Sequence, residues 1–258
     1  MTIDLNADLG ESFGRWTLGD DEALLTSISS ASVACGYHAG DPGVMRRTVR
    51  SARSRGVALG AHPGLPDLAG FGRRRMAVSA QEVEDFVLYQ VGALAAIAAA
   101  EGARLRHVKP HGALYDMCAR ERPIAKAFAR AVATLDAGLV VFGPPDSALL
   151  QEAEAAGLST AREGFADRSY EPDGSLTPRD RPGSVIHSAR EVIDRAVRMV
   201  TEGVVRNSSG QDIPLRVETI CLHGDTPGSG NLARELRASL EAAGVDIQPP
   251  RGTFRTSP

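Results

Sequence analysis

Four histidines and one lysine follow separate short apolar segments of this sequence. His38, His62, His111 and His223 each come just after such a segment, and Lys109 stands two residues before His111. Histidine has an ordinary pKa of about 6.5, which suits proton transfer near neutral pH. Lysine is a compact cation that suits a phosphate or a carboxylate. The pattern predicts a site that moves protons around an anionic substrate.

Taken singly, each of these histidines is more often a hydrogen-bonded packing residue. Their corresponding positions after four different segments favour function instead. His107 and His187 lack such a context, and we assign them structural or surface roles.

Lysine is rare in this chain, which contains only Lys109 and Lys126. Lys109 stands in a Lys-Pro-His sequence, where proline restricts the backbone and the ammonium group can hold an anion. The competing interpretation is a solvated lysine at the edge of a loop. Loop residues often carry function and contribute little core packing, so we expect replacement of Lys109 to abolish activity and to leave the fold intact.

Several aspartates accompany these residues. Asp8, Asp167 and Asp225 can orient the histidines, bind a cation or serve as bases, and their alternative role is to cap helices or turns. Asp41 illustrates that alternative, because it precedes Pro42 at a predicted helix start. The residues that we predict to be catalytic are Asp8, His38, His62, Lys109, His111, Asp167 and His223.

A glycine-rich segment and several arginines could hold phosphate groups. The segment 224–230 precedes a predicted helix, and barrel enzymes often bind phosphate with backbone N–H groups after their last strands. A glycine-rich turn is by itself a weak signal, and in the arginine run 73–75 only Arg73 is assigned a role. The predicted cofactor-binding residues are Lys109, Arg73, Arg168, Gly224, Asp225, Thr226 and Gly228.

Short apolar runs that alternate with longer helical patterns must position these residues. Such βα units predict an α/β fold, and seven or eight of them close most naturally into a single-domain (β/α) barrel over residues 1–258. A doubly wound open sheet is the alternative. In a barrel the residues after the strands converge on one mouth. The predicted strands are Ile3–Leu5, Ser32–Ala34, Val57–Ala61, Leu105–Val108, Leu139–Phe142, Leu158–Ala161, Val217–Leu222 and Val245–Ile247.

Composition excludes several classes of protein. A net charge of −3 without a basic block argues against nucleic acid as a partner. The acidic N-terminus is unlike a secretory signal, and the most apolar stretch, Val91–Ala100, is too short to span a membrane. Three widely spaced cysteines fit neither a disulfide framework nor a Cys-x-x-Cys metal site. We expect a folded cytoplasmic protein with buried thiols.

Six segments of the sequence resemble the LamB/YcsF family, and the resemblance runs from about Asp4 to Thr253. Where the family commonly has cysteine and phenylalanine, this chain has Ala7 and Tyr37, and neither change removes a polar group. The matching segments are Asp-Leu-Asn-Ala-Asp-Leu-Gly-Glu-Ser-Phe-Gly, Ala-Cys-Gly-Tyr-His-Ala-Gly-Asp-Pro, Gly-Ala-His-Pro-Gly-Leu-Pro-Asp, Val-Lys-Pro-His-Gly-Ala-Leu-Tyr, Phe-Ala-Asp-Arg-Ser-Tyr and His-Gly-Asp-Thr-Pro-Gly.

This resemblance implies a barrel related to the glycoside hydrolases and polysaccharide deacetylases. It also implies an intracellular subunit that works with two partner subunits, B and C, to hydrolyse 5-oxo-L-proline to L-glutamate while ATP is cleaved. ATP is the implied cofactor, accompanied by a divalent cation, Mg²⁺.

Two alternatives stay open. The histidines and aspartates also suit a metal-dependent amidase or deacetylase, although the only His-x-x-x-His spacing, His107–His111, spans the end of a predicted strand and gives no compact metal signature. Metal ligands are therefore unassigned. The chain also lacks a Gly-x-x-x-x-Gly-Lys-Ser/Thr nucleotide loop, which fits a non-catalytic lactam-binding subunit or a nucleotide site supplied by a partner.

Overall fold

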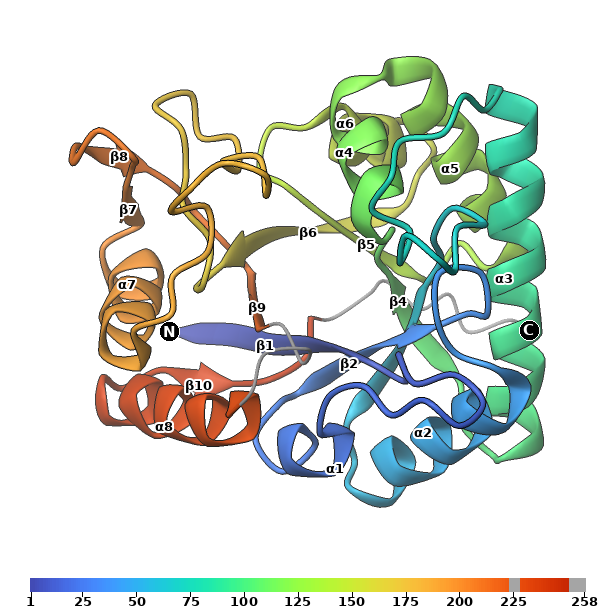
Figure 1. Cartoon of the computed structure of the whole chain (residues 1–258), viewed down its shortest axis with the longest axis horizontal. Coiled ribbons are helices and arrows are strands. Elements are labelled where there is room, and N and C mark those ends of the chain that lie inside the picture. Colours follow the sequence, from blue (N-terminus) through green and yellow to red (C-terminus); the bar gives the residue numbers. More distant parts are fainter. Residues whose placement is uncertain (223–227, 251–258) are drawn as a thin grey trace.

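Seven parallel strands form a closed barrel within residues 1–222 and 228–250, which are the residues described by this computed structural model (Figure 1). The ring closes because the last of the seven pairs with both its predecessor and the first strand. The strands are β1 (Thr2–Leu9), β2 (Ser30–Ala34), β3 (Ala58–His62), β4 (Leu105–Val108), β5 (Val140–Gly143), β6 (Ser159–Phe165) and β9 (Thr219–Leu222). The barrel prediction is confirmed, and the open-sheet alternative is wrong.

One further strand, β10 (Asp246–Ile247), pairs with the start of β1 and stays outside the closed ring. An antiparallel pair, β7 (Val204–Arg206) and β8 (Asp212–Pro214), lies between β6 and β9 in the chain. The helices that accompany the strands are α1 (Asp21–Leu24), α2 (Pro42–Ser54), α3 (Ala80–Ala100), α4 (Gly112–Arg120), α5 (Arg122–Leu135), α6 (Ala148–Ala155), α7 (Ala189–Thr201) and α8 (Ser229–Ala242).

The helix starts follow from capping residues in the sequence. Asp41 accepts hydrogen bonds from the N–H groups of Gly43 and Val44 at the start of α2, as its place before Pro42 predicts. Helix α3 is the one helix in the described residues with the length and apolar composition to cross a membrane. In the fold it packs against α5, α2 and β3, which is the position of an outer barrel helix (Figure 1).

Two predicted strand boundaries are wrong in a way that matters for the site. The strand predicted at Ile3–Leu5 extends to Leu9, and the strand predicted at Leu158–Ala161 extends to Phe165. Asn6, Asp8 and Glu163 therefore lie within strands instead of after them. All three side chains are buried. They belong to one polar cluster, whose members supply the hydrogen-bond partners that water would supply at the surface.

A buried carboxylate, Asp4, lies near the start of β1. Its oxygens accept hydrogen bonds from the hydroxyls of Ser29, Ser30 and Thr219, at 2.6, 2.7 and 2.6 Å. Burial raises the pKa of Asp4 to about 6 despite these hydrogen bonds. The folded chain therefore binds a proton at Asp4 more tightly than the unfolded chain does.

This pKa predicts a specific loss of stability with rising pH. The Asp4 pKa rises from 3.8 unfolded to about 6 folded, so its contribution to the free energy of unfolding falls by about 3 kcal/mol as pH rises through this window. About half of the fall lies between pH 5 and 7.5. Urea unfolding at these two pH values should show it in the native chain and not in Asp4→Asn. If the free energies of unfolding of the native chain and of Asp4→Asn changed equally with pH, the pH dependence would not come from Asp4.

Candidate functional site

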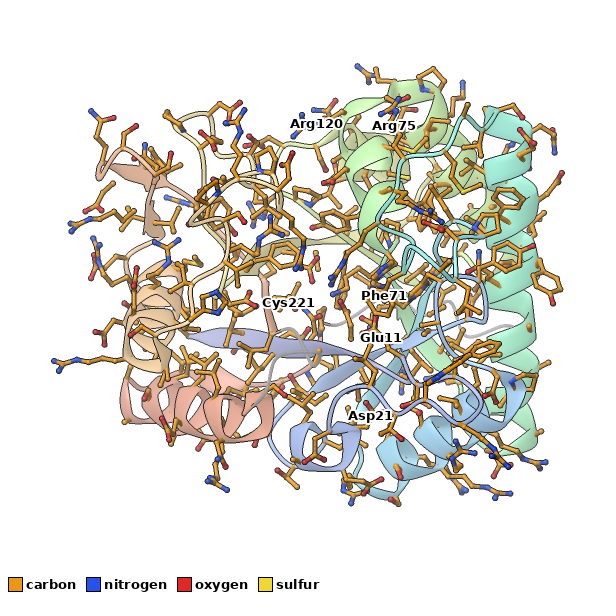
Figure 2. All side chains as sticks on the ribbon, viewed as in Figure 1. Glu11, Asp21, Phe71, Arg75, Arg120 and Cys221 are labelled. Atoms are coloured by element: carbon orange, nitrogen blue, oxygen red, sulfur yellow. The ribbon has the colours of Figure 1, made fainter. Side chains whose placement is uncertain are left out.

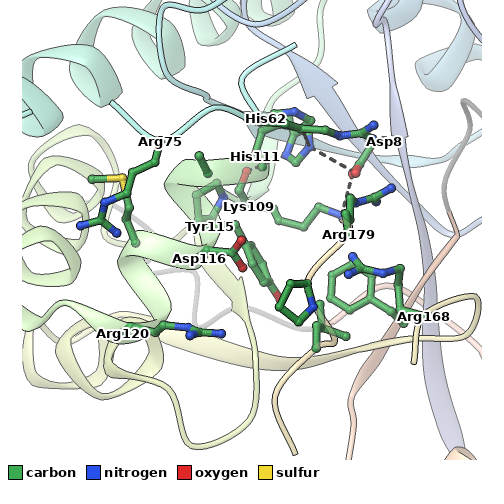
Figure 3. A pocket seen from close by; sticks show the side chains of 18 of the residues that line it. Asp8, His62, Arg75, Lys109, His111, Tyr115, Asp116, Arg120, Arg168 and Arg179 are labelled. Carbon is green, nitrogen blue, oxygen red and sulfur yellow. Dashed lines mark hydrogen bonds and ion pairs between the residues drawn. The ribbon is translucent and has the colours of Figure 1, made fainter. Parts of the chain in front are cut away.

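A cavity of about 510 Å³ opens at the carboxyl ends of the barrel strands (Figure 3). Its walls come from β1, from the segments after β3 and β4, and from the long segment between β6 and α7. The acidic, basic and imidazole side chains at its inner end are Asp8, Glu11, His62, Lys109 and His111. This is the end of a barrel where enzymes of this architecture carry their active sites.

Lys109 forms the centre of a buried polar cluster. Its Nζ lies 2.6 Å from Asp8 Oδ1, 3.1 Å from Glu163 Oε1 and 3.1 Å from Asn6 Oδ1, and its side chain is almost completely buried. Burial disfavours the charged ammonium, but attraction to Asp8 and Glu163 outweighs it and holds the pKa of Lys109 well above its ordinary value. Lys109 is therefore a fixed ammonium group held between two carboxylates, and it is a poor base.

Asp8 connects this lysine to the histidines. Its Oδ2 lies 3.2 Å from His62 Nε2, while its Oδ1 contacts Lys109 (Figure 3). The other nitrogen of His62, Nδ1, lies 2.7 Å from the carbonyl oxygen of Lys109. A carbonyl can only accept a hydrogen bond, so this Nδ1 carries the proton. The carboxylate thus lies between a cation and an imidazole, where it can take or pass a proton.

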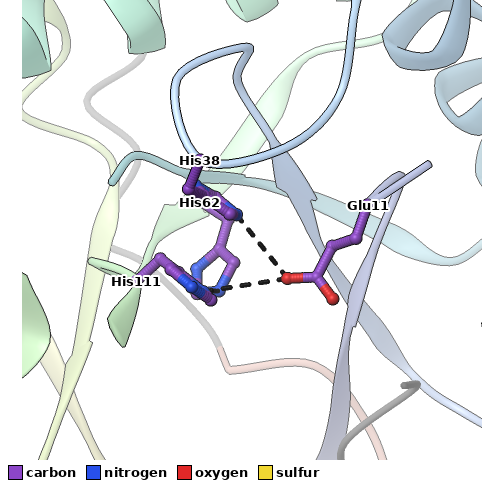
Figure 4. A group of neighbouring side chains, drawn as sticks. All are labelled: Glu11, His38, His62 and His111. Carbon is purple, nitrogen blue, oxygen red and sulfur yellow. Dashed lines mark hydrogen bonds and ion pairs between the residues drawn. The ribbon is translucent and has the colours of Figure 1, made fainter. Parts of the chain in front are cut away.

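Three imidazoles and one carboxylate meet in one group (Figure 4), and one of the imidazoles, His62, contacts Asp8. Glu11, His38, His62 and His111 each offer one ligand atom, and these atoms all lie within 4.8 Å of one another. Glu11 Oε1 is 3.6 Å from His38 Nε2 and 3.7 Å from His111 Nδ1. All four side chains are buried, so this group has the composition and the compactness of a metal site.

The histidines of this group pack closely on one another. The rings of His38 and His111 stack with centroids 3.8 Å apart. Burial and the neighbouring imidazoles hold the pKa of each well below its ordinary value, so both rings are neutral at pH 7. Gly64 and Gly72 make room for them, because a Cβ at Gly64 would lie 2.5 Å from His38 Nδ1 and one at Gly72 would lie 2.9 Å from His111 Cδ2.

Arginines form much of the outer wall of the cavity. Arg120 is the last residue of α4, and Figure 2 places Arg75 close to it. Both line the cavity, together with Arg73 and Arg179. Arg168 also lines it, but its buried guanidinium donates to the carbonyls of Ser184 and Thr177, at 3.1 and 2.6 Å. Burial lowers the pKa of Arg168 to about 10, and nearby Arg179 adds to this effect. This wall favours an anionic ligand.

The structure brings together most of the described residues that the sequence singled out. The cavity is lined by Asp8, His62, Lys109 and His111. His38 does not line it, but its ring stacks on that of His111. Of the predicted cofactor-binding residues, Arg73 and Arg168 line it in addition to Lys109.

Other predicted residues lie elsewhere. Asp167 is buried next to Arg168 and does not line this cavity, and Gly228 forms the N-terminal boundary of α8, away from the cavity lining. His223, Gly224, Asp225 and Thr226 lie outside the described residues.

Two residues of the site were not predicted as site residues: Glu11, which lines the cavity, and Glu163, which contacts Lys109. Both belong to segments that resemble the family or adjoin them, but neither stands beside a histidine or lysine in the sequence. His107 has a structural role, as expected: its ring stacks on Phe142 at 4.2 Å and lies 3.2 Å from Ser32 Oγ inside the barrel.

Comparisons with known proteins agree with this architecture. A protein from Methylococcus capsulatus, named as the A subunit of 5-oxoprolinase, is 56% identical over 95% of this chain and 95% of its own length. A Bacillus subtilis protein of the same name is 50% identical over 95% of each chain. The crystal structure of a lactam utilization protein from Thermus thermophilus superposes with a TM-score of 0.91 at 48% identity, covering 96% of this chain and 99% of that one.

A more distant structure shares the fold alone. The catalytic domain of a peptidoglycan N-acetylglucosamine deacetylase from Eubacterium rectale superposes with a TM-score of 0.52 at 12% identity, over 100% of this chain and 94% of that one. The family model for LamB/YcsF proteins matches residues 3–255. With this match and these identities over nearly its whole length, the chain belongs to the LamB/YcsF family.

Proposed function

We propose that this chain is the A subunit of an ATP-dependent 5-oxoprolinase, which hydrolyses 5-oxo-L-proline to L-glutamate in the cytoplasm together with two other subunits, B and C. We further propose that residues 1–258 form a single (β/α)-barrel domain. Relatives that are 50–56% identical carry the name of this subunit. The observation that carries the proposal is the cavity itself, in which the fixed Lys109–Asp8 pair lies between a histidine cluster and an arginine wall.

The reaction makes three demands on such a cavity. ATP phosphorylates the lactam oxygen, so an O–P bond forms and ADP leaves. Water then adds to the activated ring carbon and gives up a proton, the C–N bond breaks, and the ring nitrogen takes up a proton. A second water releases phosphate from the resulting γ-glutamyl phosphate. The site must hold anions, accept a proton from water and protonate nitrogen.

The residues around the cavity match these demands. Lys109 is a fixed cation for the substrate carboxylate or the developing oxyanion, and Asp8 is placed to accept the proton of water. His62 and His111 are placed to carry that proton to the leaving nitrogen. The arginine wall, including Arg73, suits the phosphate groups of ATP or of the phosphorylated lactam.

ATP, accompanied by Mg²⁺, is the proposed cofactor. The sequence contains no Gly-x-x-x-x-Gly-Lys-Ser/Thr loop, so we propose that the partner subunits complete the nucleotide site. Calorimetric titration of this chain with ATP and with 5-oxoproline separates a nucleotide-binding subunit from one that binds only the lactam.

Reconstitution tests the function. We expect the isolated chain to release glutamate at less than about 1% of the rate of the complete system, because transfer of the γ-phosphoryl group needs cationic clamps that partners would supply. Glutamate and phosphate are measured for the chain alone and after addition of the products of its two neighbouring genes. Full turnover by the isolated chain would contradict the need for partners. A complete system that never releases glutamate would contradict the function itself.

The group of Glu11 and three histidines favours one other candidate, a metal-dependent amidase or deacetylase that needs no ATP. The same assay separates the two. Glutamate release that needs a divalent metal and proceeds fully without ATP would support the second candidate, whereas equal amounts of glutamate and phosphate support the first.

A further inference from the structure

We propose that Glu11, His62 and His111, with His38 as a fourth ligand, bind one divalent transition-metal ion of the zinc type at the inner end of the cavity. The inference concerns the site alone and does not depend on the proposed reaction. Two of these ligands, His62 and His111, face each other.

Both of these histidines have one ring nitrogen held by a backbone carbonyl. His62 Nδ1 lies 2.7 Å from the carbonyl oxygen of Lys109, and His111 Nε2 lies 2.8 Å from that of Phe71. Because carbonyl oxygens only accept hydrogen bonds, these two nitrogens carry the protons. Metal-binding histidines hold their outer N–H groups in the same way, which fixes the ring and its tautomer.

The inner nitrogens then face each other as lone pairs. His62 Nε2 and His111 Nδ1 are 3.0 Å apart. When each ring carries a single proton, on its outer nitrogen, no proton lies between these two inner nitrogens. Two acceptors at this distance repel each other. A cation bound by both nitrogens removes the repulsion and turns both lone pairs into ligands.

Further acceptors surround the same point. Glu11 Oε1 lies 3.7 Å from His111 Nδ1, and Asp8 Oδ2 lies 3.2 Å from His62 Nε2. His38 is completely buried, and among the described residues neither of its ring nitrogens has a hydrogen-bond partner. A buried polar group without a partner is costly, and a metal ion would satisfy it.

The spacing suits a small tetrahedral ion. Zinc bonds of about 2.1 Å place neighbouring ligand atoms about 3.4 Å apart. The separations here are 3.0 Å between His62 and His111, 3.6 Å between His38 and Glu11, and 3.7 Å between His111 and Glu11. The His38 ring stacks parallel to His111 at 3.8 Å, so it must tilt to reach an ion in the plane of His111. We therefore expect His38 to contribute least.

The donor set selects the type of metal. Imidazole nitrogens suit zinc, iron, cobalt and nickel, whereas Mg²⁺ prefers oxygen ligands. This ion would thus be distinct from the Mg²⁺ that accompanies ATP. Glu11, His62 and His111 line the cavity, so water can reach the ion, and zinc lowers the pKa of bound water to near 7. Asp8 lies next to the proposed ion, because its Oδ2 is 3.2 Å from His62 Nε2.

Metal binding by the full-length chain tests the proposal. The chain is purified without chelator, stripped, dialysed and titrated with Zn²⁺ and separately with Mg²⁺ by calorimetry, and Co²⁺ absorption reports the coordination. We expect one equivalent of Zn²⁺ to bind, with Mg²⁺ much weaker. His62→Gln and His111→Gln should each weaken Zn²⁺ binding at least about 100-fold, and His38→Gln about 10-fold.

His187→Gln is the matched control, because His187 is exposed and far from the group in sequence. It should bind Zn²⁺ as the native chain does. Thermal melts identify variants that fail to fold, and Zn²⁺ should raise the melting temperature of the native chain and not of folded His62→Gln or His111→Gln. The proposal is overturned if the folded native chain binds no stoichiometric Zn²⁺, if Mg²⁺ binds more tightly, or if both glutamine variants bind Zn²⁺ normally.

Discussion

Replacing Lys109 with glutamine should lower coupled glutamate release in the reconstituted system on the order of 1000-fold, because the amide lacks the fixed charge that holds the anion. The same change should destabilise the fold by about 3–5 kcal/mol, since the buried carboxylates of Asp8 and Glu163 lose their cation. Steady-state rates and urea unfolding measure the two effects. From the sequence we expected replacement of Lys109 to leave the fold intact, because loop residues contribute little to core packing. That premise is wrong, since Lys109 is among the largest fully buried side chains.

The other lysine of the chain supplies the control. Lys126 is exposed on α5, so Lys126→Gln should change neither turnover nor stability beyond about 0.5 kcal/mol. Lys109→Arg keeps the positive charge but replaces the compact ammonium with a planar guanidinium. Compared with Lys109→Gln, it should restore part of the stability and a smaller part of the turnover rate. If folded Lys109→Gln retains turnover within tenfold of the native chain, the ammonium is structural and the proposed role is wrong.

Asp8→Asn should lower turnover about 1000-fold while the Michaelis constant for 5-oxoproline changes little. Asparagine preserves the shape of the side chain but cannot accept the proton of water, and loss of a general base has an effect of this size. It also removes the negative charge between Lys109 and His62. Steady-state rates and Michaelis constants of the native and variant proteins in the reconstituted system measure both effects.

Asp41→Asn provides the matched control for this change. Asp41 caps α2 outside the cavity, and asparagine caps helices as well as aspartate does. Its turnover should equal that of the native chain. A folded Asp8→Asn variant with more than about a tenth of native turnover would show that Asp8 only positions Lys109.

Much of the fold follows from local patterns in the sequence. Short apolar runs separated by capped helices indicate βα units, and Leu105–Val108 was predicted with the bounds that the structure gives. The failures lie where polar residues enter strands. Asn6, Asp8 and Glu163 look like the ends of strands because a sequence pattern assigns polar side chains to solvent. In the barrel Asn6 contacts Glu163, and all three contact Lys109.

The sequence by itself determined which residue types follow each strand, and parallel strands in one barrel place those residues at the same mouth. It did not determine the group that we propose to bind a metal, because Glu11, His38, His62 and His111 span about 100 residues without a compact motif. Their ligand atoms come within 4.8 Å only when β1, β2, β3 and β4 lie side by side in the ring. Tertiary structure likewise decided which nitrogen of His62 and of His111 carries a proton toward the backbone, since these nitrogens contact the carbonyls of Lys109 and Phe71. Local patterns act over a few residues, whereas the charge and the lone pairs of a site depend on neighbours that only folding supplies.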